Sequence, residues 1–273
     1  MAFRELESRR IEASNTIWAL LVGADLAANA ISQSRETSEL TLAKIFPSVK
    51  HVQRFDLRAD RAQTVLGKVE KDFCTMAMAH SIALHEDFVK CCLEMLIPQG
   101  KYSRTKLREV NTNTIHEDFA TATGQVIDAD ILALFHLTRL IRNCHIHAGG
   151  RVNARLKEFR NILSESQAEL WEELSGEPPE SPDVGDNAKV GVGGLVATLA
   201  IGKQLAYEIN LGLQRVFPRA VWADIAVDEY LRLSGKRPSD TTVIRSLPGY
   251  LRGGFGALRL SGHELQAALD RLR

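Results

Sequence analysis

Residues 141–150, IRNCHIHAGG, gather side chains that could move protons and bind phosphate. Histidine titrates near neutral pH, so His147 or His145 could take or give a proton. Arg142 offers a planar fork of donors that stays charged, which suits a phosphate gaining negative charge. Asn143 could hold a phosphate oxygen or fix the tautomer of a histidine. Cleaving RNA without a metal needs such a set, with a base for the 2′-hydroxyl proton and a cation for the crowded phosphorane.

A purely structural interpretation of this segment stays open. Cationic side chains near the C-terminus of a helix satisfy its terminal carbonyls and its dipole. His145 is on the same face as Arg142, so it could bind substrate or simply cap the helix. Cys144 fits a small core side chain better than a nucleophile, because no cysteine-protease arrangement surrounds it.

Helical geometry limits how these side chains could act together. At about 100° per residue, Asn143 and His147 share a face, whereas Arg142 and His147 diverge by roughly 140°. One regular helix therefore does not aim both side chains at a single phosphate. Either the helix loosens before Gly149, or a second subunit completes the cleft.

Apolar periodicity predicts the helices that position this segment. Between residues 60 and 96, apolar side chains recur at spacings of three or four, which predicts one long amphipathic helix, or two in line, ended by Pro98. The same pattern runs from residue 128 to about 147, with acidic side chains at its start and a glycine pair as its stop. The core side of this second helix is expected to carry Ile131, Leu134, Leu137, Ile141 and Cys144.

The rest of the chain also favours helices, so the predicted fold class is all-α. No run of alternating β-branched residues and no Asn-Gly turn indicates a strand. Residues 247–260, LPGYLRGGFGALRL, are expected to form a mobile turn, or a second RNA or partner contact. Further helices are expected over residues 3–33 with a possible break near Ser14-Asn15, over 151–163 with an acidic helix after it, over 188–216 and 220–233, and after Ser261, where Glu264 completes a capping box.

Composition and charge describe an ordinary globular chain. Of the 273 residues, 45% are hydrophobic and 25% charged, and the 34 basic and 34 acidic side chains cancel, so a polyanionic partner must meet a local basic patch. No HExxH motif or paired Cys/His spacing appears, so no metal and no cofactor is expected. No signal peptide and no membrane-spanning run is found, which predicts a cytoplasmic protein. Its four cysteines, expected to be reduced thiols, are Cys74, Cys91, Cys92 and Cys144.

A basic stretch and an acidic stretch follow the 141–150 segment. Residues 164–186 carry eight acidic side chains and no lysine or arginine, and they end in the best linker of the chain, SGEPPESPDVGD. The chain is therefore divided into a helical core (1–163), an acidic linker (164–187) and a C-terminal helical extension (188–273). The basic stretch, which could bind RNA phosphates or be a solvated helix face, supplies Arg151, Arg155, Lys157 and Arg160.

The pattern Arg-Asn-x-x-x-His at a helix end, followed by a glycine turn, resembles the signature of the HEPN superfamily. The upstream sequence AMAHSIALHEDFVKCCLEML (77–96) is similar to the long helix of such domains, in which an acidic residue near the Glu86 position lies opposite the motif. The resemblance covers roughly residues 60–160. Toxins of one subgroup have a tyrosine where this chain has Gly149, so regulation through that tyrosine is not carried over.

The resemblance implies an all-α, HEPN-like bundle that dimerises so that two motifs face one cleft. Many members are metal-independent endoribonucleases found among toxins and anti-phage defence effectors, and others have lost activity and act as binding modules. On this basis His147 is the expected general acid/base and Arg142 the transition-state stabiliser, with Asn143 and His145 in support. Glu86 would orient His147 or pair with Arg142, or it is a solvated helix residue. RNA is the expected substrate of a homodimer, with an antitoxin or sensor protein as a possible partner and no membrane.

Two other functions stay open. A non-catalytic helical module that binds a partner protein or a nucleotide would fit the zero net charge, and about half of the chain is not explained by the motif. A DNA-binding regulator could use the C-terminal helices, because the chain from Arg215 onward holds ten basic and six acidic residues. No helix-turn-helix spacing supports that regulator.

Overall fold

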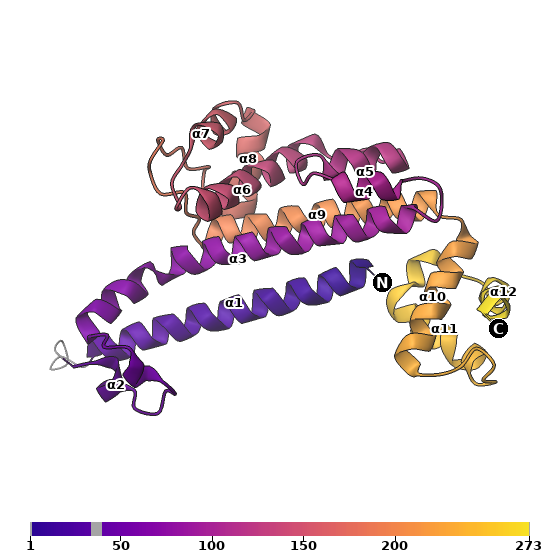
Figure 1. Ribbon diagram of the computed structural model, residues 1–273, viewed down its shortest axis with the longest axis horizontal. Helices are drawn as coiled ribbons and strands as arrows, with labels where there is room; N and C mark the ends of the chain where they lie inside the picture. The colour runs from indigo at the N-terminus through magenta and orange to yellow at the C-terminus, as the bar shows by residue number, and fades with distance from the viewer. Residues whose placement is uncertain (1, 34–39, 273) are drawn as a thin grey trace. The chain divides into compact units, whose positions relative to one another are not determined.

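Helices make up the regular secondary structure of the part of the chain that the computed structural model describes, residues 2–33 and 40–272. Isolated β-bridges join Thr41 to Arg58 and Arg151 to Asn187, but no strand forms in these ranges. The predicted all-α class is confirmed. Within the same ranges, every helix is too short or too polar to cross a membrane. The α-helices (Figure 1) are α1 (Ala2–Gln33), α2 (Leu42–Ile45), α3 (Ala59–Leu96), α4 (Arg104–Glu109), α5 (Ile115–Thr123), α6 (Ala129–His147), α7 (Ala154–Asn161), α8 (Glu165–Ser175), α9 (Val192–Val216), α10 (Arg219–Ser234), α11 (Val243–Gly254) and α12 (Gly262–Leu272), with 3-10 turns η1 (Val52–Arg54) and η2 (Gly256–Leu258).

The chain forms two compact units, each built from separate segments. The motif unit, which carries the Arg-Asn-x-x-x-His pattern, consists of Arg9–Leu84 and Asp128–Gln204. The C-terminal unit consists of Met1–Ser8, His85–Ile127 and Leu205–Arg273. The predicted domains (1–163, 164–187 and 188–273) are each continuous in sequence, whereas both compact units combine distant segments. The predicted division stays a prediction.

Helix α6 forms as its sequence predicts. The Asp128 side chain caps its start and accepts hydrogen bonds from the amides of Asp130 at 2.9 Å and Ile131 at 3.1 Å. At its other end, the amides of Ala148 and Gly150 both donate to the carbonyl of Cys144 at 3.0 Å. Both glycines of the stop have positive φ, 60° and 77°, a backbone conformation that favours glycine. The five predicted core residues are all buried: Ile131, Leu134, Leu137, Ile141 and Cys144.

Helices α7 and α8 fold back on α6 within the motif unit (Figure 1). Asn153 caps α7, and Ser164 forms a capping box with Gln167 at the start of α8. The amide group of Gln167 also donates to Asp130 at 3.0 Å, which ties α8 to the first turn of α6. Each helix buries one large apolar side chain, Leu156 on α7 and Trp171 on α8.

Helix α1 is continuous, so the predicted break near Ser14-Asn15 is wrong. Serine and asparagine lower helix propensity by only a fraction of about 1 kcal/mol each, and neither Pro nor Gly adjoins them. The helix also has two apolar faces. One carries buried Ile17 and Ile31, whereas the other leaves four apolar side chains exposed, namely Ile11 (51%), Trp18 (42%), Val22 (57%) and Leu26 (64%).

In the C-terminal unit, α10, α11 and α12 surround a shared apolar core. The predicted capping box of α12 is confirmed, because the amide of Glu264 donates to Ser261 Oγ at 3.3 Å while the amide of Ser261 donates to Glu264 Oε2 at 2.7 Å. The mobile turn predicted for residues 247–260 is wrong at its start. That part of the chain is helix α11, because Val243, Leu247 and Leu251 recur every fourth residue and are buried, which outweighs the internal Pro248.

Candidate functional site

The Arg-Asn-x-x-x-His pattern occupies the last turns of α6, in the motif unit. Helix α6 stays helical through His147, so it does not loosen before the glycine stop. Asn143 and His147 therefore lie within about 40° of each other around the helix, whereas Arg142 points roughly 140° away from His147. Arg142 and Asn143 are half-buried, and His147 is exposed. A single chain thus presents an accessible imidazole and an amide on one face, with the guanidinium on another.

His145 differs from His147 in its surroundings. It is half-buried, and its Nδ1 atom is enclosed and makes no hydrogen bond within the described part of the chain. The backbone of Gly150 passes close to this atom, because a Cβ placed on Gly150 would lie 4.0 Å from it. His145 therefore rests against the turn that ends α6, while His147 is the histidine that solvent reaches.

Glu86 lies on α3, in a segment that belongs to the C-terminal unit, and it is buried. The alternative that Glu86 is a solvated helix residue is therefore wrong, because its side chain is buried. Its predicted role toward His147 or Arg142 stays a prediction.

The basic stretch after the motif binds the acidic segment, which is defined here as residues 177–187. Arg151 Nη1 donates to the carbonyl oxygen of Gly185 at 2.7 Å. Lys157 Nζ pairs with the carboxylate of Asp183 at 2.5 Å, and Arg160 donates to the carbonyl oxygen of Glu180. Three of the four predicted RNA-binding residues thus have partners within the motif unit.

Main-chain hydrogen bonds also join the acidic segment to the basic stretch, next to the glycine stop. The amide of Val152 donates to the carbonyl of Asp186, and the amide of Gly185 donates to the carbonyl of Val152, both at 2.9 Å. The amide of Ala188 donates to the carbonyl of Gly150 at 2.7 Å. The acidic segment therefore ends beside the turn that follows His147. Long-range pairing of this kind leaves no local signal in the sequence.

The contacts between the basic stretch and the acidic segment shift the pKa values of their side chains. A hydrogen bond from Lys157 lowers the pKa of Asp183, and the charge of the lysine acts in the same direction. Burial lowers the pKa of Arg160, an effect that the nearby Glu180 and Cys144 oppose. A guanidinium with a lowered pKa still carries its charge at neutral pH.

Arg155 is the one predicted RNA-binding residue that is exposed and makes no hydrogen bond or ion pair within the described ranges. Arg155 belongs to α7, but its charge acts on His136 in the middle of α6, so the two side chains lie near each other. Burial lowers the pKa of His136 to about 4, and the charges of Arg139 and Arg155 lower it further. No sequence motif marks the buried Arg139, although its spacing of three from His136 puts both on one helix face.

We predict that His136 stays neutral at pH 7 and makes the protein less stable in acid. Between about pH 6.5 and pH 4 the unfolded chain binds a proton that the folded chain does not, so the free energy of unfolding falls as the pH drops through this window. Urea unfolding of the wild type and of His136→Gln, at about pH 7 and about pH 4.5, measures this effect. Acidification should lower the free energy of unfolding of the variant less than that of the wild type. Equal decreases in both proteins would contradict a neutral His136 in the folded protein.

Two other histidines, His85 and His116, pack against each other in the protein interior. In the C-terminal unit, His85 on α3 and His116 on α5 are buried and stacked, with their Nε2 atoms 2.9 Å apart. One ring must donate and the other accept in this bond. Within the described ranges, no group of three or more His, Cys, Asp or Glu side chains is arranged to hold a metal ion.

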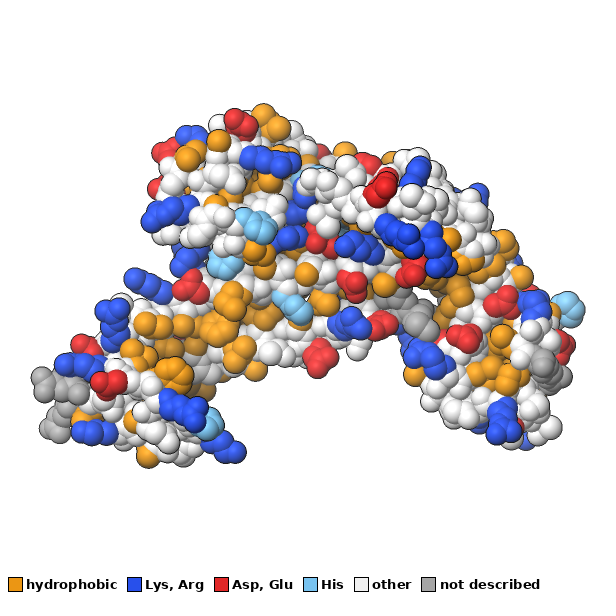
Figure 2. Space-filling model, in the orientation of Figure 1, with side chains coloured by type: hydrophobic (Ala, Val, Ile, Leu, Met, Phe, Trp, Pro, Cys, Tyr) orange, Lys and Arg blue, Asp and Glu red, His pale blue; other side chains and the backbone are white. Residues whose placement is uncertain are grey.

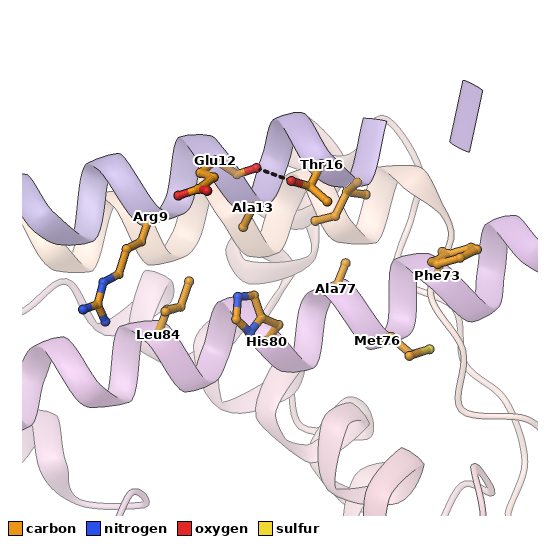
Figure 3. A pocket seen from close by; sticks show the side chains of 10 residues that line it. Arg9, Glu12, Ala13, Thr16, Phe73, Met76, Ala77, His80 and Leu84 are labelled. Carbon is orange, nitrogen blue, oxygen red and sulfur yellow. Dashed lines mark hydrogen bonds between the residues drawn. The ribbon is translucent and has the colours of Figure 1, made fainter. Parts of the chain in front are cut away.

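A groove of about 550 Å³ separates α1 from α3 in the motif unit. Figure 3 shows Arg9 and Ala13 of α1 and His80 and Leu84 of α3 pointing into it, while Glu12 and Thr16 lie along α1 at its edge. Apolar side chains complete the lining, and Figure 2 shows hydrophobic side chains gathered over this part of the surface. The sequence analysis did not identify this groove. The exposed apolar stripe of α1 does not mark it, because the α1 residues that line the groove lie on a different face of the helix.

Comparison with known proteins found no matching family model, no matching curated protein and no matching solved structure. The resemblance to HEPN domains therefore depends on the chain's own residues. Those residues are the end of α6, its glycine stop and the α3 sequence around Glu86.

Proposed function

We propose that this protein is a metal-independent endoribonuclease of the HEPN type, acting as a toxin or an anti-phage defence effector in the cytoplasm. The observation that carries the proposal is the end of α6. There the Arg-Asn-x-x-x-His pattern falls on the last helical turns, and the terminal His147 is exposed beside a basic return helix. An exposed imidazole at a helix end can reach an RNA backbone, which a core histidine cannot.

In this mechanism His147 takes the proton of the 2′-hydroxyl as the 2′-oxygen attacks the adjacent phosphorus. The bond from phosphorus to the 5′-oxygen breaks, and solvent supplies the proton that the leaving oxygen needs. Arg142 stabilises the negative charge of the phosphorane, and Asn143 binds a non-bridging oxygen or holds the imidazole. The products are a 2′,3′-cyclic phosphate and a 5′-hydroxyl.

The reacting phosphate needs side chains from two copies of the chain. Within one regular α6, Arg142 and His147 diverge by roughly 140°. A two-fold pair of α6 helices can place the Arg142 of one copy opposite the His147 of the other, since every contact of such an interface occurs twice. Dimerisation is therefore part of the proposed mechanism.

Cleavage of a single-stranded RNA by the purified protein in EDTA tests the proposal directly. We expect fragments that end in a 2′,3′-cyclic phosphate and begin with a 5′-hydroxyl, because the nucleophile is the substrate's own 2′-oxygen. Blocking that oxygen with a methyl group should abolish cleavage. Cleavage that requires a divalent metal, or that continues on the 2′-O-methyl RNA, would contradict the mechanism.

The groove between α1 and α3 favours a second candidate function, a non-catalytic module that binds a partner protein. Exposed apolar side chains around an open groove are typical of protein-binding surfaces. A module of this kind would keep RNA intact and would lose its partner when Met76, an exposed apolar residue that lines the groove, is replaced with lysine. The endoribonuclease, in contrast, would lose cleavage with changes at α6.

A further inference from the structure

The acidic segment adjoins two groups of cations in the motif unit. Arg151, Lys157 and Arg160 bind it directly. Next to it, a cavity of about 350 Å³ is lined by Glu180 and Asn187 of the segment and by Lys68, Lys71, Lys189 and Glu70. Of these lysines, Lys189 pairs with Asp72. A stretch of chain that contacts several cations occupies a place where a nucleic-acid backbone would also be stable.

The acidic side chains of the segment are spaced regularly. Glu177, Glu180, Asp183 and Asp186 follow one another at every third position. Three prolines in residues 177–183 favour an extended backbone, in which side chains three residues apart point the same way. Residues 177–183 therefore resemble a short single strand with a negative charge at every third position, and a turn in which the amide of Asp186 donates to the carbonyl of Asp183 follows them.

The contacts that hold the segment are exchangeable. Lys157 and Asp183 have 41% and 79% of their side chains exposed, and ion pairs in such surroundings are screened by water and salt. Arg151 and Arg160 bind carbonyl oxygens, which are weaker acceptors than a charged phosphate. All three cations would thus gain by exchanging these partners for phosphodiester oxygens.

The segment also ends beside the turn that follows the proposed catalytic His147. Gly185 and Asp186 of the segment bond to Val152, and Ala188, the residue after the segment, bonds to Gly150 of the glycine stop. An RNA strand placed at His147 and continued along α7 meets the residues that the segment covers.

We propose that the acidic segment is an intramolecular competitor of RNA, which holds Arg151, Lys157 and Arg160 until a phosphodiester backbone displaces it. This inference rests on the proposed function for the identity of the ligand. The segment lowers the affinity for short or weakly bound RNA, so the site binds strands long enough to replace several contacts at once.

The test measures binding without cleavage. The probe is a fluorescein-labelled 2′-O-methyl RNA dodecamer, which lacks the nucleophile, and its affinity is compared between the wild type and Glu177→Gln/Glu180→Gln/Asp183→Asn. We expect the triple variant to bind about tenfold more tightly, because the competitor has lost three of its charges. The matched control is Glu169→Gln/Glu172→Gln/Glu173→Gln, which removes the same charge from exposed positions of α8 and should change the affinity less than about twofold.

Hydrogen exchange supplies a second measurement on the wild type. The amides of Val152, Gly185 and Ala188 bond the segment and the residue that follows it to the stretch after α6, so they should exchange faster when the dodecamer is bound. Amides in the middle of α6 serve as the internal reference. Unchanged exchange at these three amides, or equal affinities of the triple variant and the α8 control, would overturn the inference.

The same measurements separate this inference from the proposed function. If unmodified RNA stays intact while the triple variant binds the dodecamer more tightly than its control, the nuclease is wrong and the competition stands. If RNA is cleaved but the acidic substitutions have no effect, the competition is wrong and the nuclease stands. Failure of every variant to bind the dodecamer rejects the competition.

Discussion

Replacing His147 with alanine is expected to slow RNA cleavage about a hundredfold or more, the usual contribution of a positioned group that transfers a proton. The imidazole is exposed at the last residue of α6, so its removal opens no cavity. We therefore expect the free energy of unfolding to change by less than about 0.5 kcal/mol. The measurement is the single-turnover cleavage rate in EDTA, paired with urea unfolding of the same preparation.

Two histidine substitutions serve as controls for this result. His263 is exposed on α12 in the C-terminal unit, so His263→Ala loses the same side chain without touching the motif and should cleave at the wild-type rate. His145→Ala tests the neighbour that rests against the glycine stop, and a supporting role there predicts a smaller loss than at His147. A His147→Ala protein that cleaves as fast as the wild type would remove the proposed catalytic role.

Local sequence patterns were sufficient to predict the helix that carries the motif. The cap at Asp128, the apolar repeat of α6 and the glycine stop all act within a few residues, so each can be read directly from the chain. Helix α11 was missed for the opposite reason. Its Pro248 and its glycines are local signals of a turn, but burial of Leu247 and Leu251 against other helices decides the conformation.

The surroundings of the candidate site could be predicted only in part. The sequence predicts which residues are basic after α6, but it does not show that Lys157 pairs with Asp183, 26 positions further along. The pKa of His136 is likewise lowered first by burial and then by the charges of Arg139 and of Arg155 from another helix. Contacts between elements distant in sequence are set by tertiary packing, and the spacing of apolar residues does not predict them.

Mixing two inactive variants tests whether the reacting groups come from different copies. In a two-fold dimer, Arg142→Ala keeps His147, and His147→Ala keeps Arg142. A mixed dimer therefore has one site with both groups intact and one site with neither. Arg142 is half-buried, so Arg142→Lys is run beside Arg142→Ala to keep the charge and much of the packing while losing the planar fork.

The two variants alone should each cleave about a hundredfold more slowly than the wild type. After unfolding and refolding together at equal concentrations, about half of the dimers are mixed and each has one complete site, so about a quarter of the wild-type rate should return. If Arg142 and His147 of the same chain formed the site, every mixed dimer would lack one group at each site and no activity would return. A protein that elutes as a monomer at the assay concentration, yet cleaves RNA at full rate, would likewise exclude a shared cleft. Restored cleavage would show that the roughly 140° between the two side chains on a regular α6 is bridged by the second subunit.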